Sequence, residues 1–189
     1  MTPTEILTDE HRLILEVLDC LEAAASRLDD GDAIDPAFFL EAAEFASGFA
    51  DRCHHAKEED ILFVAMTARD MPQDSGPVAV MLHEHEEGRR YTAAFRSAAE
   101  RLQAGDAGAA ADIVRNVFDY VELLREHIHK EDNVLFPMAE QVVPEDEMRA
   151  VAEEFRKVTA ADENAGRLDK YQSLAEKLRN DLASRPAVA

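Results

Sequence analysis

The feature that most constrains this chain is a histidine and glutamate unit that occurs twice. In the first copy, His11 is followed 43 positions later by His54-x-x-x-Glu58. In the second copy, His85 is followed 42 positions later by His127-x-x-x-Glu131. Imidazole and carboxylate groups together suit a transition metal, so the doubled unit predicts a site for two metal ions.

The composition favours a soluble all-α protein. A chain of 189 residues is long enough to bury a full core, and its many alanine, leucine, glutamate and arginine residues favour helices. The net charge of -20 repels phosphate backbones and anionic lipids, so we expect neither nucleic acid nor a membrane as a partner. Glu5, Asp9 and Glu10 stand where a signal peptide would be basic and then apolar, which makes the cytoplasm the expected location.

Turn and capping residues divide most of the chain into four long helices. Thr2-Pro3-Thr4-Glu5 is a capping box that begins a helix predicted to end near residue 28. Asp35-Pro36 begins a second helix that reaches about residue 69, and Pro77 begins a third that reaches about residue 103. A fourth runs from the turn at 104–108 to the region of Pro137. Because the connections are short, the prediction is an antiparallel up-down-up-down four-helix bundle.

The chain changes character after Pro144. One amphipathic helix is predicted from Met148 to Val158, and another follows Gly166. We therefore predict a bundle domain over residues 1–143 and a C-terminal helical extension over residues 144–189. The extension is expected to pack on the bundle.

The bundle brings the repeated residues level with one another. The first turn centres near position 32.5, so residue 11 faces residue 54, and the third turn centres near 106, so residue 85 faces residue 127. The middle turn, near 73, sets residue 85 level with about residue 61, one turn from Glu58. The six residues should thus lie in one layer and interrupt the apolar stripes of their helices. Burying these polar side chains without partners would cost free energy, and a bound metal usually offsets that cost.

The remaining histidines have more polar surroundings. A competing His55–Glu59 pair exists, but its row on the helix runs through Asp51. His83 and His129 lie about 200° around the helix from His85 and His127, so they should face solvent. These positions exclude His55, His83 and His129 as predicted ligands.

Several other residues near the proposed ligands have two interpretations. Glu10, Glu84 and Glu126 each precede a proposed ligand, and one of them could hydrogen-bond a histidine of a neighbouring helix, although solvated surface charge is the preferred interpretation. Gly88 lies one turn beyond His85, where a missing side chain leaves room for a small ligand or allows close helix packing.

At these residues the chain resembles a hemerythrin-like (HHE cation-binding) protein, a bacterial family of four-helix bundles around a non-haem di-iron centre. The resemblance covers about residues 5–140. The matching segments are Asp9-Glu10-His11, His54-His55-Ala56-Lys57-Glu58-Glu59, Glu84-His85-Glu86-Glu87-Gly88-Arg89, and Glu126-His127-Ile128-His129-Lys130-Glu131 before Leu135-Phe136-Pro137. The resemblance implies a cofactor of two iron ions with an oxo or hydroxo bridge. It also implies the ligands His11, His54, Glu58, His85, His127 and Glu131.

The third and fourth helices depart from the oxygen-carrying members. Those proteins supply five histidines and two carboxylates, with His-x-x-x-His on the third helix and His-x-x-x-x-Asp on the fourth. Here Met81 and Arg89 stand four positions either side of His85, and the fourth helix has His-x-x-x-Glu, although Asp132 offers the longer spacing. The pattern is closer to a branch with four histidines and two glutamates.

The ligand count bears on reactivity. If both glutamates bridge, each iron receives two histidines and two carboxylate oxygens, and an oxo or hydroxo bridge leaves one open position on each iron. More open iron favours activation of a small oxidant over its storage.

Three functions are consistent with such a site. The first is a di-iron protein that reacts with O2, peroxide or NO in oxidative or nitrosative stress handling. The alternative is a reversible O2 carrier, or a module that senses oxygen or iron, without turnover. A structural site that holds zinc is the third. The expected partner is a small diatomic or peroxide ligand, and the expected state is a monomer or homodimer.

Overall fold

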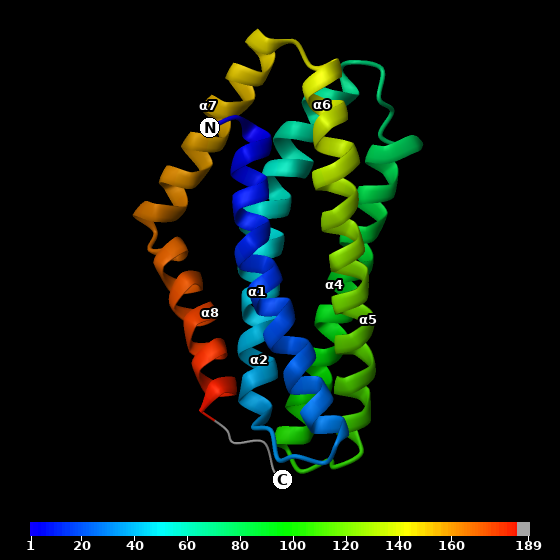
Figure 1. Ribbon diagram of the computed structural model, residues 1–189, viewed down its shortest axis with the longest axis vertical. Helices are drawn as coiled ribbons and strands as arrows, with labels where there is room; N and C mark the ends of the chain where they lie inside the picture. Colours follow the sequence, from blue (N-terminus) through cyan, green and yellow to red (C-terminus); the bar gives the residue numbers. More distant parts are fainter. Residues whose placement is uncertain (185–189) are drawn as a thin grey trace.

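Four long antiparallel rods form a helical bundle in the computed structural model, which describes residues 1–184 (Figure 1). The described residues contain no strand, so the predicted all-α fold is confirmed. The first rod is α1 (Pro3–Asp29) and the third is α4 (Gly76–Gln103). The second comprises α2 (Pro36–Phe45), η1 (Ala46–His55), η2 (Glu58–Leu62) and α3 (Phe63–Thr67), and the fourth comprises α5 (Ala109–Lys130), η3 (Glu131–Leu135) and α6 (Phe136–Val142).

The first two rods begin at the predicted capping residues. The side chain of Thr2 accepts a hydrogen bond from the backbone N–H of Glu5 at 3.2 Å, and the Glu5 carboxylate accepts one from the backbone N–H of Thr2 at 2.8 Å. The Asp35 side chain accepts from the backbone N–H of Ala37 at 3.0 Å. These bonds satisfy backbone donors that a helix leaves free at its first turn.

The second and fourth rods contain π-helical segments, labelled η. In a π-helix each backbone N–H bonds five residues back instead of four, so every turn holds more residues and successive side chains diverge by a smaller angle. Glu58 begins η2 and Glu131 begins η3, which places a π-helical turn at each His-x-x-x-Glu unit. The change of helical period therefore coincides with the residues of the repeat.

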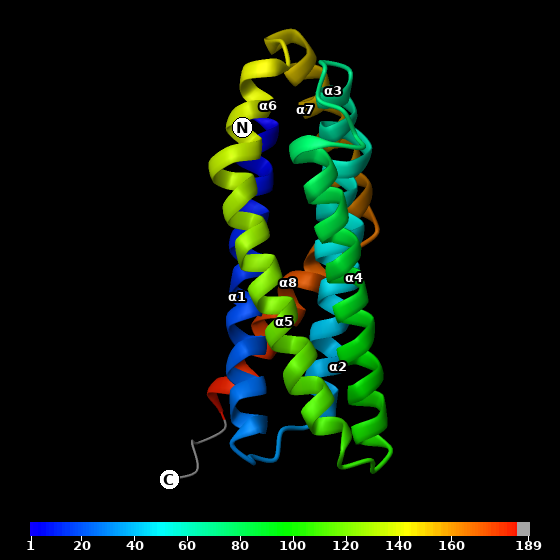
Figure 2. The same cartoon turned by 90° about the vertical axis from the view of Figure 1, so that its right-hand side faces the viewer.

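Two further helices, α7 (Glu145–Asn164) and α8 (Arg167–Ala183), lie along the side of the bundle formed by α1 and the second rod (Figures 1 and 2). Phe155 of α7 and Tyr171 and Leu178 of α8 are buried within the core. The described part of the extension thus packs on the bundle, while residues 185–189 lie outside the described residues. The division of the chain at residue 143 stays a prediction.

The apolar core is divided into two clusters by a polar layer. Ile14, Phe95 and Leu124 belong to the cluster on one side of the layer, and Leu7 and Leu62 belong to the cluster on the other. The histidines and glutamates of the repeat lie between them in the sequence of each rod. None of the helices within residues 1–184 is long and apolar enough to cross a membrane.

Candidate metal centre

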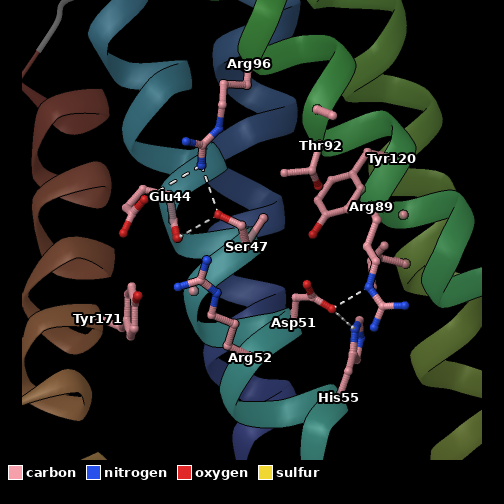
Figure 3. A pocket seen from close by; sticks show the side chains of 15 residues that line it. Glu44, Ser47, Asp51, Arg52, His55, Arg89, Thr92, Arg96, Tyr120 and Tyr171 are labelled. Carbon is pink, nitrogen blue, oxygen red and sulfur yellow. Dashed lines mark hydrogen bonds and ion pairs between the residues drawn. The ribbon is translucent and has the colours of Figure 1, made fainter. Parts of the chain in front are cut away.

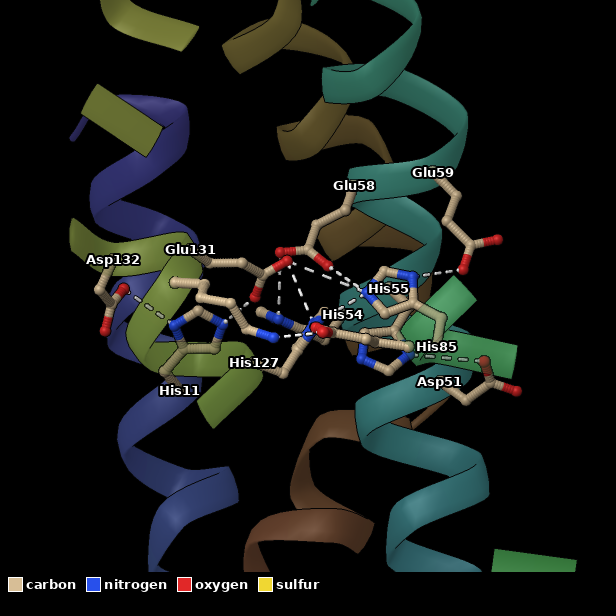
Figure 4. A network of polar contacts seen from close by, with 12 residues as sticks. His11, Asp51, His54, His55, Glu58, Glu59, His85, His127, Glu131 and Asp132 are labelled. Carbon is tan, nitrogen blue, oxygen red and sulfur yellow. Dashed lines mark hydrogen bonds and ion pairs between the residues drawn. The ribbon is translucent and has the colours of Figure 1, made fainter. Parts of the chain in front are cut away.

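The structure brings all six predicted ligands together in the polar layer (Figure 4). Each of these residues is at most 1% exposed, so the layer is shielded from solvent. Potential ligand atoms form two groups within which they lie no more than 4.8 Å apart. One group consists of His11, His54, Glu58 and Glu131, and the other consists of His55, Glu58, His85 and His127.

The carboxylate of Glu58 reaches both histidine pairs. Its Oε1 lies 3.4 Å from Nε2 of His54, and its Oε2 lies 3.4 Å from Nε2 of His85. Glu58 thus has one oxygen beside each half of the layer.

Glu131 repeats this arrangement from the fourth rod. Its Oε2 lies 3.2 Å from Nε2 of His11, and its Oε1 lies 3.2 Å from Nε2 of His127. Both glutamates therefore extend across the layer between the same two pairs of histidines.

The donor atoms of this layer fit a cation. Both oxygens of Glu58, both oxygens of Glu131 and Nε2 of His11 are buried without a hydrogen-bond partner among the described residues. Leaving such groups without a partner is costly, and a metal ion satisfies them together. The Nε2 atoms of His85 and His127 lie 3.0 Å apart. That is about the separation of two adjacent ligands at roughly 2.1 Å from one ion.

A ring of carboxylates orients the four histidines, and each carboxylate comes from the preceding helical rod. Nδ1 of His54 donates to Glu10 at 3.0 Å, from the second rod to the first. Nδ1 of His85 donates to Glu59 at 2.6 Å, from the third rod to the second.

The other two histidines are oriented in the same way by the remaining rods. Nδ1 of His127 donates to Glu84 at 2.9 Å, and Nδ1 of His11 donates to Asp132 at 3.0 Å. A histidine whose Nδ1 carries the proton presents the lone pair of Nε2, so all four rings are held in the tautomer that a metal requires.

These hydrogen bonds correct part of the interpretation from sequence. The preferred interpretation of Glu10 and Glu84 as solvated surface charge is wrong, because both bind a histidine of the next rod, whereas Glu126 is exposed as expected. Each of the two inward carboxylates also binds a lysine. Lys57 binds Glu10 and Lys130 binds Glu84, and each lysine directly precedes a glutamate of the layer.

Asp132 lies outside both groups of potential ligands. Its carboxylate accepts hydrogen bonds from Nδ1 of His11 and from the hydroxyl of Thr8, at 3.0 and 2.9 Å. Its position is that of a residue that orients His11, and the five-residue spacing from His127 does not place it within the layer.

His55 contradicts the expected facing of its helix. The residue is only 5% exposed, and its ring stacks on His85 with the centroids 3.8 Å apart. The smaller angle between successive residues in η1 explains how adjacent His54 and His55 both point inward. The expected outward facing of His55 is therefore wrong, while His83 and His129 are exposed as expected.

As long as no metal is bound, the layer is a set of coupled ion pairs. Burial alone would lower the pKa of His11 and His127, but hydrogen bonds and the charge of nearby carboxylates raise it to about 9 and about 10. Burial would raise the pKa of Glu131, and so would the charge of Glu58, yet the histidines lower it to about 2. Burial and the charge of His85 lower the pKa of His55 to about 3. A metal would replace the protons on the raised histidines.

Comparison with known proteins gives a family match over most of the chain. The sequence model described as Hemerythrin HHE cation binding domain matches residues 2–139. The iron-sulfur cluster repair protein YtfE of Musicola paradisiaca is 33% identical over 88 residues, and that of Dickeya chrysanthemi is 32% identical over 88 residues. Each match covers 46% of this chain and only 40% of the relative.

A longer match extends into the C-terminal helices. The uncharacterized protein Rv1995 of Mycobacterium tuberculosis is 25% identical over 180 residues, which is 94% of this chain and 68% of that protein. No solved structure matches the chain. Since the family model covers well over half of the sequence, the chain belongs to the hemerythrin HHE cation-binding domain family.

Proposed function

We propose that this protein is a non-haem di-iron protein that reacts with O2, peroxide or NO in oxidative or nitrosative stress handling. The observation that carries the proposal is the position of Glu58 and Glu131, whose four oxygens lie between two histidine pairs without hydrogen-bond partners. Each glutamate would bridge two iron ions. His11 and His54 would hold one ion, and His85 and His127 would hold the other.

The chain itself supplies charge balance, orientation and shielding. Two carboxylates in the layer offset the charge of the ions and favour the oxidised state, and the orienting carboxylates add electron density to the histidines. Burial of the layer between two apolar clusters excludes water. The iron pair would supply the electrons that reduce a small oxidant.

The stress-related part of the proposal is supported by the relatives named as iron-sulfur cluster repair proteins. Their similarity covers 46% of this chain, so it supports a stress-related role around iron without extending to their whole activity. A cytoplasmic location stays a prediction of the sequence.

Reversible O2 carriage is a second candidate because of His55. Oxygen carriers hold their iron with five histidines, and His55 places a fifth imidazole beside His85 and His127. A site with fewer open positions would store a ligand instead of turning it over.

Peroxide turnover separates these two functions. Repeated additions of peroxide to the iron-loaded protein should release O2 each time, far beyond one equivalent per chain, and the chelated protein should release none. Stable oxygenation that reverses under argon, with no continued O2 release, would contradict the enzymatic proposal and favour the carrier.

A further inference from the structure

A cavity of about 450 Å³ lies between η1 and α4, next to the polar layer (Figure 3). Tyr120 and Leu124 of α5 and Tyr171 of α8 are among the residues that line it. A Cβ atom on Gly48 would lie 1.9 Å from the Tyr171 hydroxyl oxygen, so Gly48 is needed for this ring to reach the cavity. The C-terminal extension therefore helps to shape a space beside the proposed iron site.

His55 connects this cavity with the layer. It lines the cavity and also belongs to the group that contains His85 and His127, whereas no other member of the two groups lines this cavity. Gly88, which the sequence singled out as a place for a small ligand or for close packing, lines the same cavity and sits against Leu124. The close packing at Gly88 is therefore observed, while room for a small ligand there stays a prediction.

Both ring nitrogens of His55 differ from those of the four oriented histidines. Each of those four has Nε2 within 3.4 Å of a layer carboxylate and Nδ1 hydrogen-bonded to an orienting carboxylate. Within residues 1–184, His55 forms no ion pair with Glu58 or Glu131, and its Nδ1 is buried without a hydrogen-bond partner, 3.7 Å from Asp51. Its ring lies nearly parallel to that of His85, at 14°. Because two nearly parallel stacked rings do not direct their nitrogens at one ion, this orientation favours His55 as a hydrogen-bond donor over a fifth iron ligand.

The cavity carries a small excess of positive charge, because Arg52, Arg89 and Arg96 line it together with Glu44 and Asp51. Asp51 pairs with Arg89 at 2.7 Å, and Glu44 binds Lys170 at 2.7 Å and lies 3.7 Å from Arg96. Arg52 forms no ion pair with any of the described residues. In a chain with a net charge of -20, this local charge would attract small anions that the rest of the surface repels.

We propose that this cavity admits a small anion to the His85–His127 half of the centre, and that the imidazole N–H of His55 donates a hydrogen bond to it there. The inference rests on the proposed di-iron function and adds the entrance to that site and the residue that positions its ligand. A peroxide anion or nitrite has this chemistry, and azide is a small probe of the same charge.

The opposite side of the layer offers a competing path. A second cavity there is lined by Thr8, Arg12 and Asp132, and Phe136 stacks on His11 with centroids 5.6 Å apart. No member of the two metal groups lines that cavity. Arg12 is exposed and pairs with Asp9, which makes Arg12→Gln a matched control for Arg52→Gln.

The test measures azide binding to the iron-loaded protein through the optical charge-transfer band of the complex. The iron content is measured on every sample. His55→Ala should keep the wild-type iron content and weaken azide binding about tenfold, the loss of one hydrogen bond. His55→Gln, which retains a donor, should stay within about threefold of wild type, and exposed His129→Ala should be unchanged. Arg52→Gln should slow azide association several-fold at low salt, with the difference lost at about 1 M salt, while Arg12→Gln should not.

Three outcomes would overturn the inference. Loss of iron from His55→Ala, with normal folding by circular dichroism, would show that His55 is a metal ligand. Unchanged azide affinity in His55→Ala would show that His55 donates no hydrogen bond to the anion. Slower association in Arg12→Gln alone would place the entrance on the His11 side. Failure of the wild-type protein to bind iron would instead overturn the proposed function, which keeps the two claims separate.

Discussion

Replacement of Glu58 with glutamine is expected to weaken iron binding by more than 100-fold and to leave less than about a tenth of the wild-type iron after dialysis. Glutamine keeps the shape of the side chain but removes the negative charge that lies 3.4 Å from both His54 and His85. Changes in groups that merely orient metal ligands typically cost 10–100-fold in affinity, so a bridging carboxylate should cost more. Iron content and competition with a chelator measure the effect.

Two neighbouring glutamates provide a graded control. Glu59→Gln removes the negative charge of the group that orients His85 and should weaken iron binding by about 10–100-fold. Glu126→Gln changes an exposed side chain and should have no effect. Equal iron content in all three variants would mean that Glu58 is not a bridging ligand.

Removal of the metal is expected to make the stability of the protein strongly dependent on pH. In the metal-free layer the pKa of His11 is about 9 and that of His127 is about 10, above the value of about 6.5 for an unfolded chain. A raised folded-state pKa contributes stability that is complete below pH 6.5 and is lost as the pH rises through the folded value. For His11 alone this contribution is on the order of 3 kcal/mol.

Urea unfolding from pH 6.5 to pH 10 measures this dependence. The free energy of unfolding of the chelated protein should fall by several kcal/mol over that range, since the ion pairs with Glu58 and Glu131 lose their protonated partners. The iron-loaded protein should change much less, because metal takes the place of those protons. Parallel curves for the two forms would show that the metal does not bind these histidines.

The bundle and the meeting of the six residues could be predicted from sequence because both depend on straight helices joined by short turns. Reflection through a turn pairs His11 with His54 whatever the details of packing, and the structure places Glu58 and Glu131 in the same layer. The assignment of these six residues as metal ligands stays a prediction until metal is measured.

The inward position of His55 could not be predicted from an α-helical period. A wheel with 3.6 residues per turn separates His54 and His55 by about 100°, and η1 reduces that angle. The period of a buried helix depends on the side chains it must fit, which a single sequence does not reveal. Two adjacent histidines followed by two adjacent glutamates, Glu58 and Glu59, were the available signal.

The ring of orienting carboxylates was also underestimated from sequence. Glu10 and Glu84 each precede a histidine on their own rod, and which neighbouring rod they meet depends on helix rotation within the bundle. The repeat did contain a sign of their role, because Lys57 and Lys130 occupy the same place in the two His-x-x-Lys-Glu segments and pair with these two glutamates.

The central claim is that Glu58 and Glu131 join two iron ions into one centre. Mössbauer spectroscopy of the oxidised protein loaded with ⁵⁷Fe tests it most directly, with iron per chain determined on the same sample. The account predicts two iron ions per chain, one for each group of ligands, with a diamagnetic ground state from magnetic coupling across the bridges. Isolated, uncoupled ferric ions, or a protein that takes up one zinc ion and no iron, would contradict it.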